Sequence, residues 1–294
     1  MKRDWEQLLL FVVLSVIWGS SFILMKQGLE QLTSFQVASL RIVSSGIVFL
    51  PLVLKSCRLI PFKKWPVVFL SGALGSLLPA YLFCTAETGL SSSLAGTLNS
   101  LTPIFTIITA ALIFKSKSST QQITGVFIAF LGCLLLFFTQ TELSFGNNPL
   151  LVVLVMIATL SYGINANVVF HHLQSIPSLQ IVSLALFLNA IPAFVVLLIT
   201  GFFSLNFHNH AVLSSIGFST LLGVLSTSIA SILYYRLIKT AGAVFSSMVT
   251  YGIPIVAIAW GVFYHENVGW LQIGSLTIIL AGVYYANKSK KQLQ

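Results

Sequence analysis

The chain has 294 residues, of which 56% are hydrophobic and 7% are charged, and its formal net charge is +9. A water-soluble domain of this length needs far more charged residues to cover its surface, so the composition excludes a soluble globular protein. In lipid every backbone polar group must be satisfied within the chain, and helices achieve this. The composition therefore predicts an all-α integral membrane protein.

The charged residues divide the chain into apolar stretches, and a membrane-spanning helix needs about 20 apolar residues. Seven such stretches are Gln7–Met25, Gln31–Leu54, Trp65–Ala86, Thr88–Phe114, Ser118–Thr141, Thr240–His265 and Asn267–Asn287. The uncharged run from Leu143 to Tyr235 is too long for one helix, and polar turn sequences at 145–149, 171–178 and 204–210 cut it into three. The sequence therefore predicts ten transmembrane helices.

The basic residues indicate how these ten helices are oriented. With a cytoplasmic N-terminus, 13 of the 15 basic residues fall on the cytoplasmic side: Lys2, Arg3, Lys55, Arg58, Lys63, Lys64, Lys115, Lys117, Arg236, Lys239, Lys288, Lys290 and Lys291. Cytoplasmic loops of membrane proteins carry such an excess of lysine and arginine. We therefore expect both termini in the cytoplasm, and we attribute the net charge to topology rather than to nucleic-acid binding.

An internal duplication is visible in the two halves of the chain. Residues 249–263, VTYGIPIVAIAWGVF, align with residues 98–112, LNSLTPIFTIITAAL, at an offset of 151 that pairs Pro254 with Pro103. Offsets of 144 and 150 pair further positions near the two ends of each half, and offsets that change only at loops indicate a repeat.

Each repeat contains five predicted helices, the first over residues 1–141 and the second over 149–294. Because five is odd, the second repeat starts from the opposite side of the membrane and the two repeats are inverted. Inverted repeats with interrupted helices are typical of secondary transporters, whose substrate site lies between the halves. The paired prolines, Pro103 and Pro254, are then expected to bend their helices and shape a gate next to the cavity, although proline also serves simple packing in membrane helices.

Four short motifs follow one another along the chain: VIWGSSFILMKQGL, SFQVASLRIV, AGTLNSLTPIFTIITAALIF and FSSMVTYGIPIVAIAWGVFYHE. In their order and spacing the chain resembles the EamA-type permeases of the drug/metabolite transporter superfamily. The resemblance implies a permease of the plasma membrane, the inner membrane of a bacterial cell, that is frequently an exporter of small metabolites. It also implies a central cavity lined by the first, third, fourth, sixth, eighth and ninth helices.

Polar and aromatic residues inside the predicted spans are the candidates for substrate binding, because such groups tend to face a bundle interior or a wet cavity. The predicted substrate-binding residues are Trp18, Ser21, Arg41, Tyr81, Asn99, Tyr162, Asn165 and Tyr251, and Asn167 is a further amide of this kind. Interfacial aromatic belts are at least an equal explanation for Tyr234 and Tyr235.

Arg41 is the one formal charge well inside a predicted span. A charge in that position is costly unless it is paired or hydrated, so it marks a candidate site. The sequence leaves two roles open, which are binding an anionic group of the substrate and hydrogen bonding to carbonyls at a helix end.

Signatures of catalysis or cofactor binding are not found in the sequence. It has no HExxH motif, no phosphate-cradling glycine loop, and three scattered cysteines without metal spacing, so we expect no enzyme activity, no cofactor and no metal. The expected partners are a small-molecule substrate and the lipid bilayer, with the protein as a monomer or homodimer.

A secondary permease working by alternating access is the function that these patterns favour, with amino acids or nucleosides as leading substrates. A lipid flippase or scramblase is the alternative, since inverted repeats and kinked helices suit it equally, and a channel is a weaker option without a ring of charge. Because no acid lies in the middle of a span, we expect transport driven by the substrate gradient. Proton coupling through Glu87 or Glu266, near external helix ends, is the second possibility.

Reporter fusions test the predicted topology. Fusions after Leu59 and after the C-terminus are expected to report a cytoplasmic location, because the basic residues gather on the cytoplasmic side. A fusion at Asn147 is expected to report an external location. Paired alkaline phosphatase and green fluorescent protein reporters measure this. A cytoplasmic signal at Asn147 would contradict the ten-helix topology.

Overall fold

The computed structural model describes residues 2–139, 149–256 and 269–288. Within these ranges the chain forms helices and turns with no strand, which confirms the predicted all-helical class. The helices of the first half are α1 (Lys2–Gly28), α2 (Ser34–Val48), α3 (Leu50–Leu59), η1 (Phe62–Lys64), α4 (Trp65–Gly72), η2 (Ala73–Leu77), α5 (Leu78–Ala86), α6 (Ser92–Asn99), α7 (Thr102–Leu112) and α8 (Thr120–Phe138).

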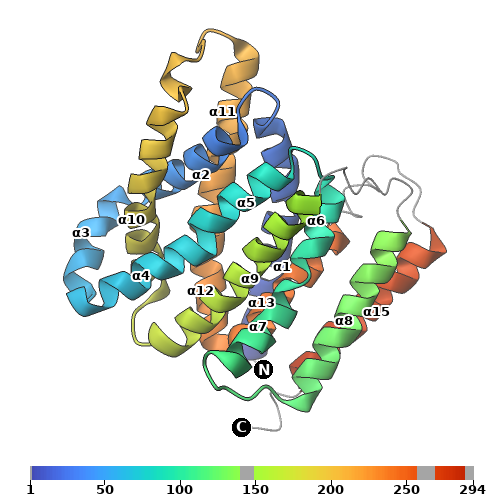
Figure 1. The fold of residues 1–294 in the computed structure, drawn as a ribbon. Coiled ribbons are helices and arrows are strands. Elements are labelled where there is room, and N and C mark those ends of the chain that lie inside the picture. Colours follow the sequence, from blue (N-terminus) through green and yellow to red (C-terminus); the bar gives the residue numbers. More distant parts are fainter. Residues whose placement is uncertain (1, 140–148, 257–268, 289–294) are drawn as a thin grey trace.

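Similar elements follow in the second half. They are α9 (Pro149–His172), α10 (Ser178–Ile199), η3 (Phe202–Ser204), α11 (His210–Leu222), η4 (Gly223–Ile229), α12 (Ala230–Ala241), α13 (Ala243–Ser247), η5 (Met248–Tyr251) and α15 (Trp270–Lys288), with further helical residues at 252–256. The start of α1 and the end of α15 lie at the same end of the molecule (Figure 1).

Seven helical stretches are long and apolar enough to cross a membrane, and a bent pair, α2 with α3, brings the number to eight. Two shorter apolar helices, Ala243–Val256 and Trp270–Ala286, lie where the ninth and tenth predicted helices were expected. The chain is therefore a multi-pass membrane protein, and the count of ten remains a prediction.

The second predicted span is not the single straight helix that we expected over Gln31–Leu54. Its two parts, α2 and α3, meet at Phe49 with a bend of 70°. Pro51 follows in the first turn of α3 and has no backbone N–H to donate to the carbonyl oxygen of Ile47 four residues earlier, so an unbroken helical hydrogen-bond ladder cannot run through this point. Helix α2 begins more conventionally, because Thr33 and Gln36 form a capping box.

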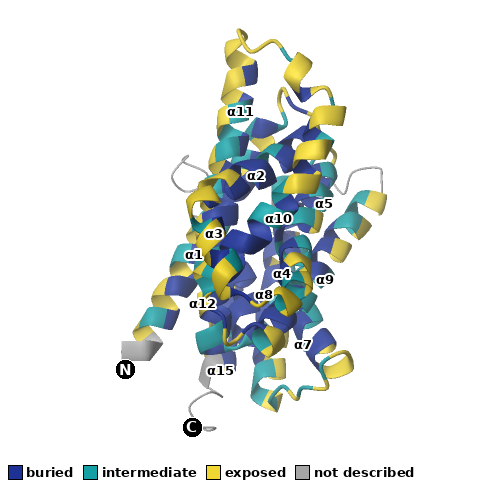
Figure 2. Cartoon of the chain, turned by 90° about the vertical axis from the view of Figure 1, so that its left-hand side faces the viewer, coloured by how far each residue is buried: buried dark blue, intermediate teal, exposed yellow. Residues whose placement is uncertain are grey.

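The distribution of exposed residues fits a lipid environment. Large apolar side chains lie exposed on the outer faces, such as Trp270 at 88% and Leu54 at 74%, while buried residues fill the interior (Figure 2). Lipid tails solvate such apolar surface, so it needs no further protein cover.

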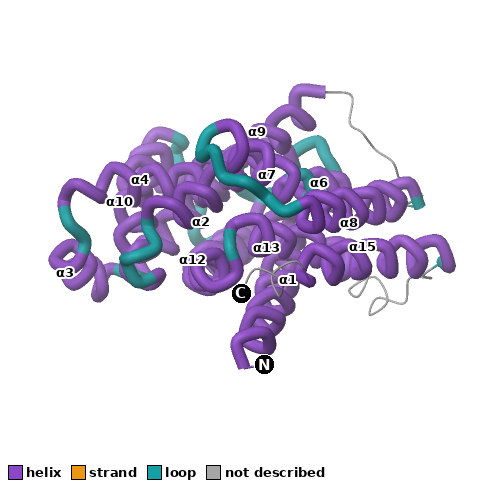
Figure 3. The backbone as a smooth tube through the Cα atoms, turned by 90° about the horizontal axis from the view of Figure 1, so that it is seen from below, coloured by secondary structure: helices purple, strands orange, loops and turns teal. Residues whose placement is uncertain are grey.

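Helices α8 and α15 lie side by side along one flank of the bundle (Figures 1 and 3). Glycines allow their backbones to approach closely: a Cβ atom at Gly282 would lie 2.7 Å from the carbonyl oxygen of Gly125, and one at Gly132 would lie 2.8 Å from the backbone nitrogen of Ile279. Small residues at a contact are the usual means of helix association in membranes.

The close contact of α8 with α15 predicts that replacing glycine by alanine affects stability differently at two positions of α15. Gly282→Ala is expected to destabilise the protein by about 1–3 kcal/mol through overpacking against α8. Gly274→Ala, where a Cβ would meet no atom within 4 Å, is the matched control and should stabilise α15 by up to about 1 kcal/mol. Thermal unfolding of the detergent-solubilised variants measures both, and equal shifts for the two would contradict the close packing.

Candidate functional site

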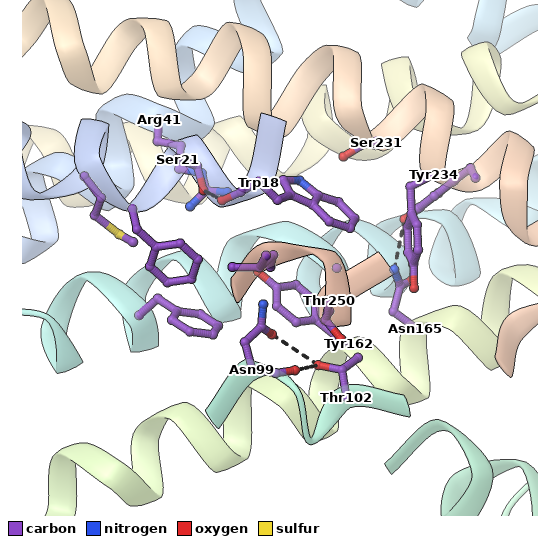
Figure 4. A pocket seen from close by; sticks show the side chains of 16 residues that line it. Trp18, Ser21, Arg41, Asn99, Thr102, Tyr162, Asn165, Ser231, Tyr234 and Thr250 are labelled. Atoms are coloured by element: carbon purple, nitrogen blue, oxygen red, sulfur yellow. Dashed lines mark hydrogen bonds between the residues drawn. The ribbon is translucent and has the colours of Figure 1, made fainter. Parts of the chain in front are cut away.

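A cavity lies among helices of both halves, and the empty space between its side chains, including the part open to solvent, is about 670 Å³. The close-up in Figure 4 shows side chains from several helices converging on it. Its lining consists of Trp18, Ser21, Phe22, Met25, Arg41, Gly75, Phe83, Asn99, Thr102, Tyr162, Asn165, Ser231, Tyr234, Tyr235, Thr250 and Ile253.

An interrupted helix brings Asn99 and Thr102 to the cavity. Helix α6 ends at Asn99, two residues intervene, and Pro103 sits in the first turn of α7. The Thr102 hydroxyl donates to the Asn99 carbonyl oxygen at 2.8 Å and lies 3.2 Å from Asn99 Oδ1 (Figure 4). The break therefore supplies its own hydrogen-bond partner, as backbone buried in a membrane requires.

The second half repeats this arrangement. The short helix α13 gives way to the turn η5, and Pro254 lies in the first turn of the helical residues 252–256. Thr250 in η5 lines the cavity. Both prolines thus begin the second part of a broken helix rather than kink the interior of a continuous one, since proline is tolerated in a first turn. Their predicted role in a gate is not tested by this geometry.

Two wide π-helical segments also contribute to the site. Segments η2 and η4 lie at corresponding positions of the two halves, related by the same offset of 151 residues. The indole Nε1 of Trp18 donates to the carbonyl oxygen of Ser226 in η4 at 3.0 Å. Insertion of one residue into a helix changes which side chains face inward, and such segments are frequent at functional sites.

The cavity is built from equivalent positions of the two halves. The offset of 144 pairs Trp18 with Tyr162 and Ser21 with Asn165, and the offset of 151 pairs three more lining positions. Those three pairs are Phe83 with Tyr234, Asn99 with Thr250, and Thr102 with Ile253. Ten of the sixteen lining residues therefore form pairs that are equivalent in position and differ in chemistry.

Arg41 breaks this symmetry most clearly, because the offset of 144 pairs it with Ala185. It is the one formally charged side chain among the described residues that line the cavity. Its Nε donates to the hydroxyl of Thr227 in η4 at 2.7 Å, and it lies beside Ser21 in Figure 4. This hydrogen bond joins the guanidinium of the first half to a side-chain hydroxyl of the second half.

Aromatic rings form much of the apolar wall. Trp18 and Tyr234 meet edge to face with ring centroids 5.0 Å apart, and Phe83 stacks on Tyr162 with centroids 6.1 Å apart. The Asn165 amide lies 3.3 Å from the Tyr235 hydroxyl. The wall therefore combines rings, amides and hydroxyls, with Arg41 as a single positive pole.

Six of the eight predicted substrate-binding residues line the cavity: Trp18, Ser21, Arg41, Asn99, Tyr162 and Asn165. The structure places Tyr81 and Tyr251 outside this lining. The Tyr81 hydroxyl lies 2.7 Å from the Ser39 hydroxyl, and the wholly buried Tyr251 donates to the carbonyl oxygen of Val126 at 2.9 Å.

The amide of Asn167 also has a structural role, since its Nδ2 donates to the Thr106 carbonyl oxygen at 2.9 Å and to the Thr109 hydroxyl at 3.0 Å. Conversely, Tyr234 and Tyr235 are buried cavity residues rather than part of an interfacial belt. The internal repeat relates Tyr234 to another lining residue, because the offset of 151 pairs it with Phe83 in the third predicted helix.

Of the two candidate residues for proton coupling, Glu87 and Glu266, the structure describes only Glu87. Glu266 lies outside the described residues. Glu87 follows α5 directly, one helical turn after the cavity residue Phe83. Within the described ranges no group of three or more His, Cys, Asp or Glu residues could hold a metal ion.

Comparisons with known proteins agree with this architecture. The EamA-like transporter family matches residues 5–138 and 149–288. An "Uncharacterized transporter" of Archaeoglobus fulgidus is 26% identical over 96% of this chain and 98% of its own length. A "Probable amino-acid metabolite efflux pump" of Salmonella typhimurium is 26% identical over 97% of this chain and 95% of its own. A solved crystal structure with 14% identity superposes with a TM-score of 0.73, covering 97% of this chain and 98% of that one.

Thiol labelling tests whether the cavity admits water-soluble molecules. In a variant whose Cys57, Cys84 and Cys133 are replaced, Ser231→Cys is expected to react at least about ten times faster with a hydrophilic methanethiosulfonate than Ser228→Cys, because only an accessible thiolate reacts. Ser228 is the matched control on the same span, fully buried and bonded to the Gly223 carbonyl oxygen at 3.2 Å. Equal rates in folded protein would show that the cavity is closed to solutes.

Proposed function

The chain belongs to the EamA-like transporter family, and from this premise we propose that it is a secondary permease that exports small amino-acid metabolites by alternating access. The observation that carries the proposal is the cavity between the two halves, lined at equivalent positions and holding one cation, Arg41. The proposal includes ten helices in two inverted repeats, residues 1–141 and 149–294, with both termini in the cytoplasm of a bacterial cell.

The chemistry of the lining favours a carboxylate-bearing substrate of low net charge. A guanidinium fixed on one side by Thr227 can offer its other N–H groups to a carboxylate, and such charge-assisted hydrogen bonds are strong. A polyanion such as a nucleotide-sugar would need several cations, whereas the described lining has one.

The rest of the lining can receive the other parts of an amino acid. The carbonyl oxygens of Asn99 and Asn165 and the neighbouring hydroxyls can accept hydrogen bonds from an ammonium group. The rings of Trp18, Phe83 and Tyr162 can pack against an apolar side chain or against the cation itself. The relative named as an amino-acid metabolite efflux pump supports this class over nucleosides.

A counterflow experiment tests the function and the role of Arg41. Proteoliposomes preloaded with phenylalanine should accumulate labelled external phenylalanine, and Arg41→Gln should reduce this rate about tenfold or more, because a charge-assisted hydrogen bond contributes about 1.5–3 kcal/mol. Arg58→Gln, an exposed arginine on the same bent span, is the matched control and should retain the wild-type rate.

The same vesicles distinguish the alternatives. Labelled uridine tests the nucleoside class, and a fluorescent phosphatidylcholine tests lipid translocation. Movement of the lipid without movement of phenylalanine or uridine would reject the permease and favour the flippase.

A further inference from the structure

Glu87 occupies an unusual place for an acidic residue near a membrane span. It closes the C-terminal end of α5, where its backbone N–H donates to the Phe83 carbonyl oxygen at 2.9 Å. Phe83 lines the cavity, so Glu87 lies one helical turn beyond the proposed substrate site. Glu30, which follows α1, is by contrast exposed and accepts a hydrogen bond from Gln27.

The carboxyl group of Glu87 is buried without a partner. Both of its oxygen atoms are inaccessible to solvent, and neither has a hydrogen-bond partner within the described part of the chain. A buried carboxylate that is neither paired nor hydrogen-bonded is strongly disfavoured, so the site favours the neutral acid. Burial accordingly raises the pKa of Glu87, which lies just after the span, to about 8, against the opposing attraction of Lys26 and Arg41.

The charged surroundings of Glu87 are few. Lys26 near the end of α1 and Arg41 on α2 are the cations that act on it, and Cys84 and Tyr81 are the titratable groups on α5 itself. From α9, the apolar Leu151 lies next to Gly89, two residues after Glu87, and the titratable Tyr162 stacks on Phe83. Arg41 is therefore the one cation in this set that also lines the cavity.

We propose that Glu87 is a proton-binding site coupled through Arg41 to the substrate site, so that a proton and a substrate carboxylate bind together. This inference rests on the proposed permease function. A carboxylate bound at Arg41 offsets the attraction of that guanidinium for an ionised Glu87, so the carboxyl group holds its proton more tightly. By reciprocity, a protonated Glu87 leaves Arg41 available to the substrate.

The proton balance of this step is simple. Glu87 takes one proton from water as the substrate carboxylate binds at Arg41, and it returns that proton to water as the substrate leaves. The coupling is therefore one of binding, and it adds a pH dependence to the expectation, based on sequence, of transport driven by the substrate gradient.

Binding of labelled phenylalanine to purified protein tests the coupling. Wild-type affinity is expected to fall about fivefold or more between about pH 6.5 and about pH 9, as Glu87 ionises. Glu87→Gln, which mimics the protonated acid, should keep the high affinity across this range, and Glu30→Gln should retain the wild-type pH dependence. The titration of phenylalanine itself is common to all variants and cancels. Identical pH dependence in wild type and Glu87→Gln would overturn the proposal.

Infrared difference spectroscopy tests the proton site without any substrate. The C=O stretch of a protonated carboxyl should disappear with a midpoint near pH 8 in the wild type and be missing in Glu87→Gln. Arg41→Gln should move the midpoint to higher pH, whereas Arg41→Lys should leave it nearly unchanged. A midpoint below about pH 6 in the wild type, or a midpoint that does not change in Arg41→Gln, would reject the proposed proton site. If phenylalanine is not transported at any pH, the proposed function fails, but this measurement still shows whether Glu87 binds a proton.

Discussion

The structure depends on one constraint, that backbone polar groups in hydrocarbon need partners within the protein. A continuous helix meets this constraint but presents no free polar group to a substrate. The cavity forms where helices are interrupted or widened, between α6 and α7, at η5, and at η2 and η4. Each described break brings in a side chain as partner, as Thr102 does for the Asn99 carbonyl and Trp18 for that of Ser226.

The internal repeat explains how the cavity can have equivalent backbone positions in its two halves and different side chains at those positions. Equivalent positions of the two halves face the same space, so both sets of breaks contribute to one site. The residues at those positions differ, as Ser21 and Asn165 do, and Arg41 has the apolar Ala185 as its counterpart. A single positive pole in an otherwise neutral wall can orient a substrate, which a fully symmetric lining could not.

Scarcity of charge makes each charged group in this region matter. Arg41 of the first half is held by Thr227 of the second, so the position of the guanidinium depends on how the halves pack. In a medium of low dielectric constant, charges act on one another over longer distances than in water. A group such as Glu87, whose carboxyl has no hydrogen-bond partner among the described residues, is in this proposal sensitive to what occupies the neighbouring cavity.

The sequence by itself determined the membrane class, the internal repeat, the family and six of the sixteen cavity residues, because hydrophobic run length, repeat offsets and polar residues within apolar stretches can be read directly from the chain. It placed Trp18, Asn99 and Asn165 correctly among the lining residues but assigned Tyr81 and Tyr251 to it as well. Only the tertiary structure decided which face of each helix points inward, since the π-helical segments shift the register of the spans that carry Phe83 and Tyr234. The partner of Arg41 and the burial of Glu87 were likewise decided by packing, because both depend on residues far away in the chain that no local pattern specifies.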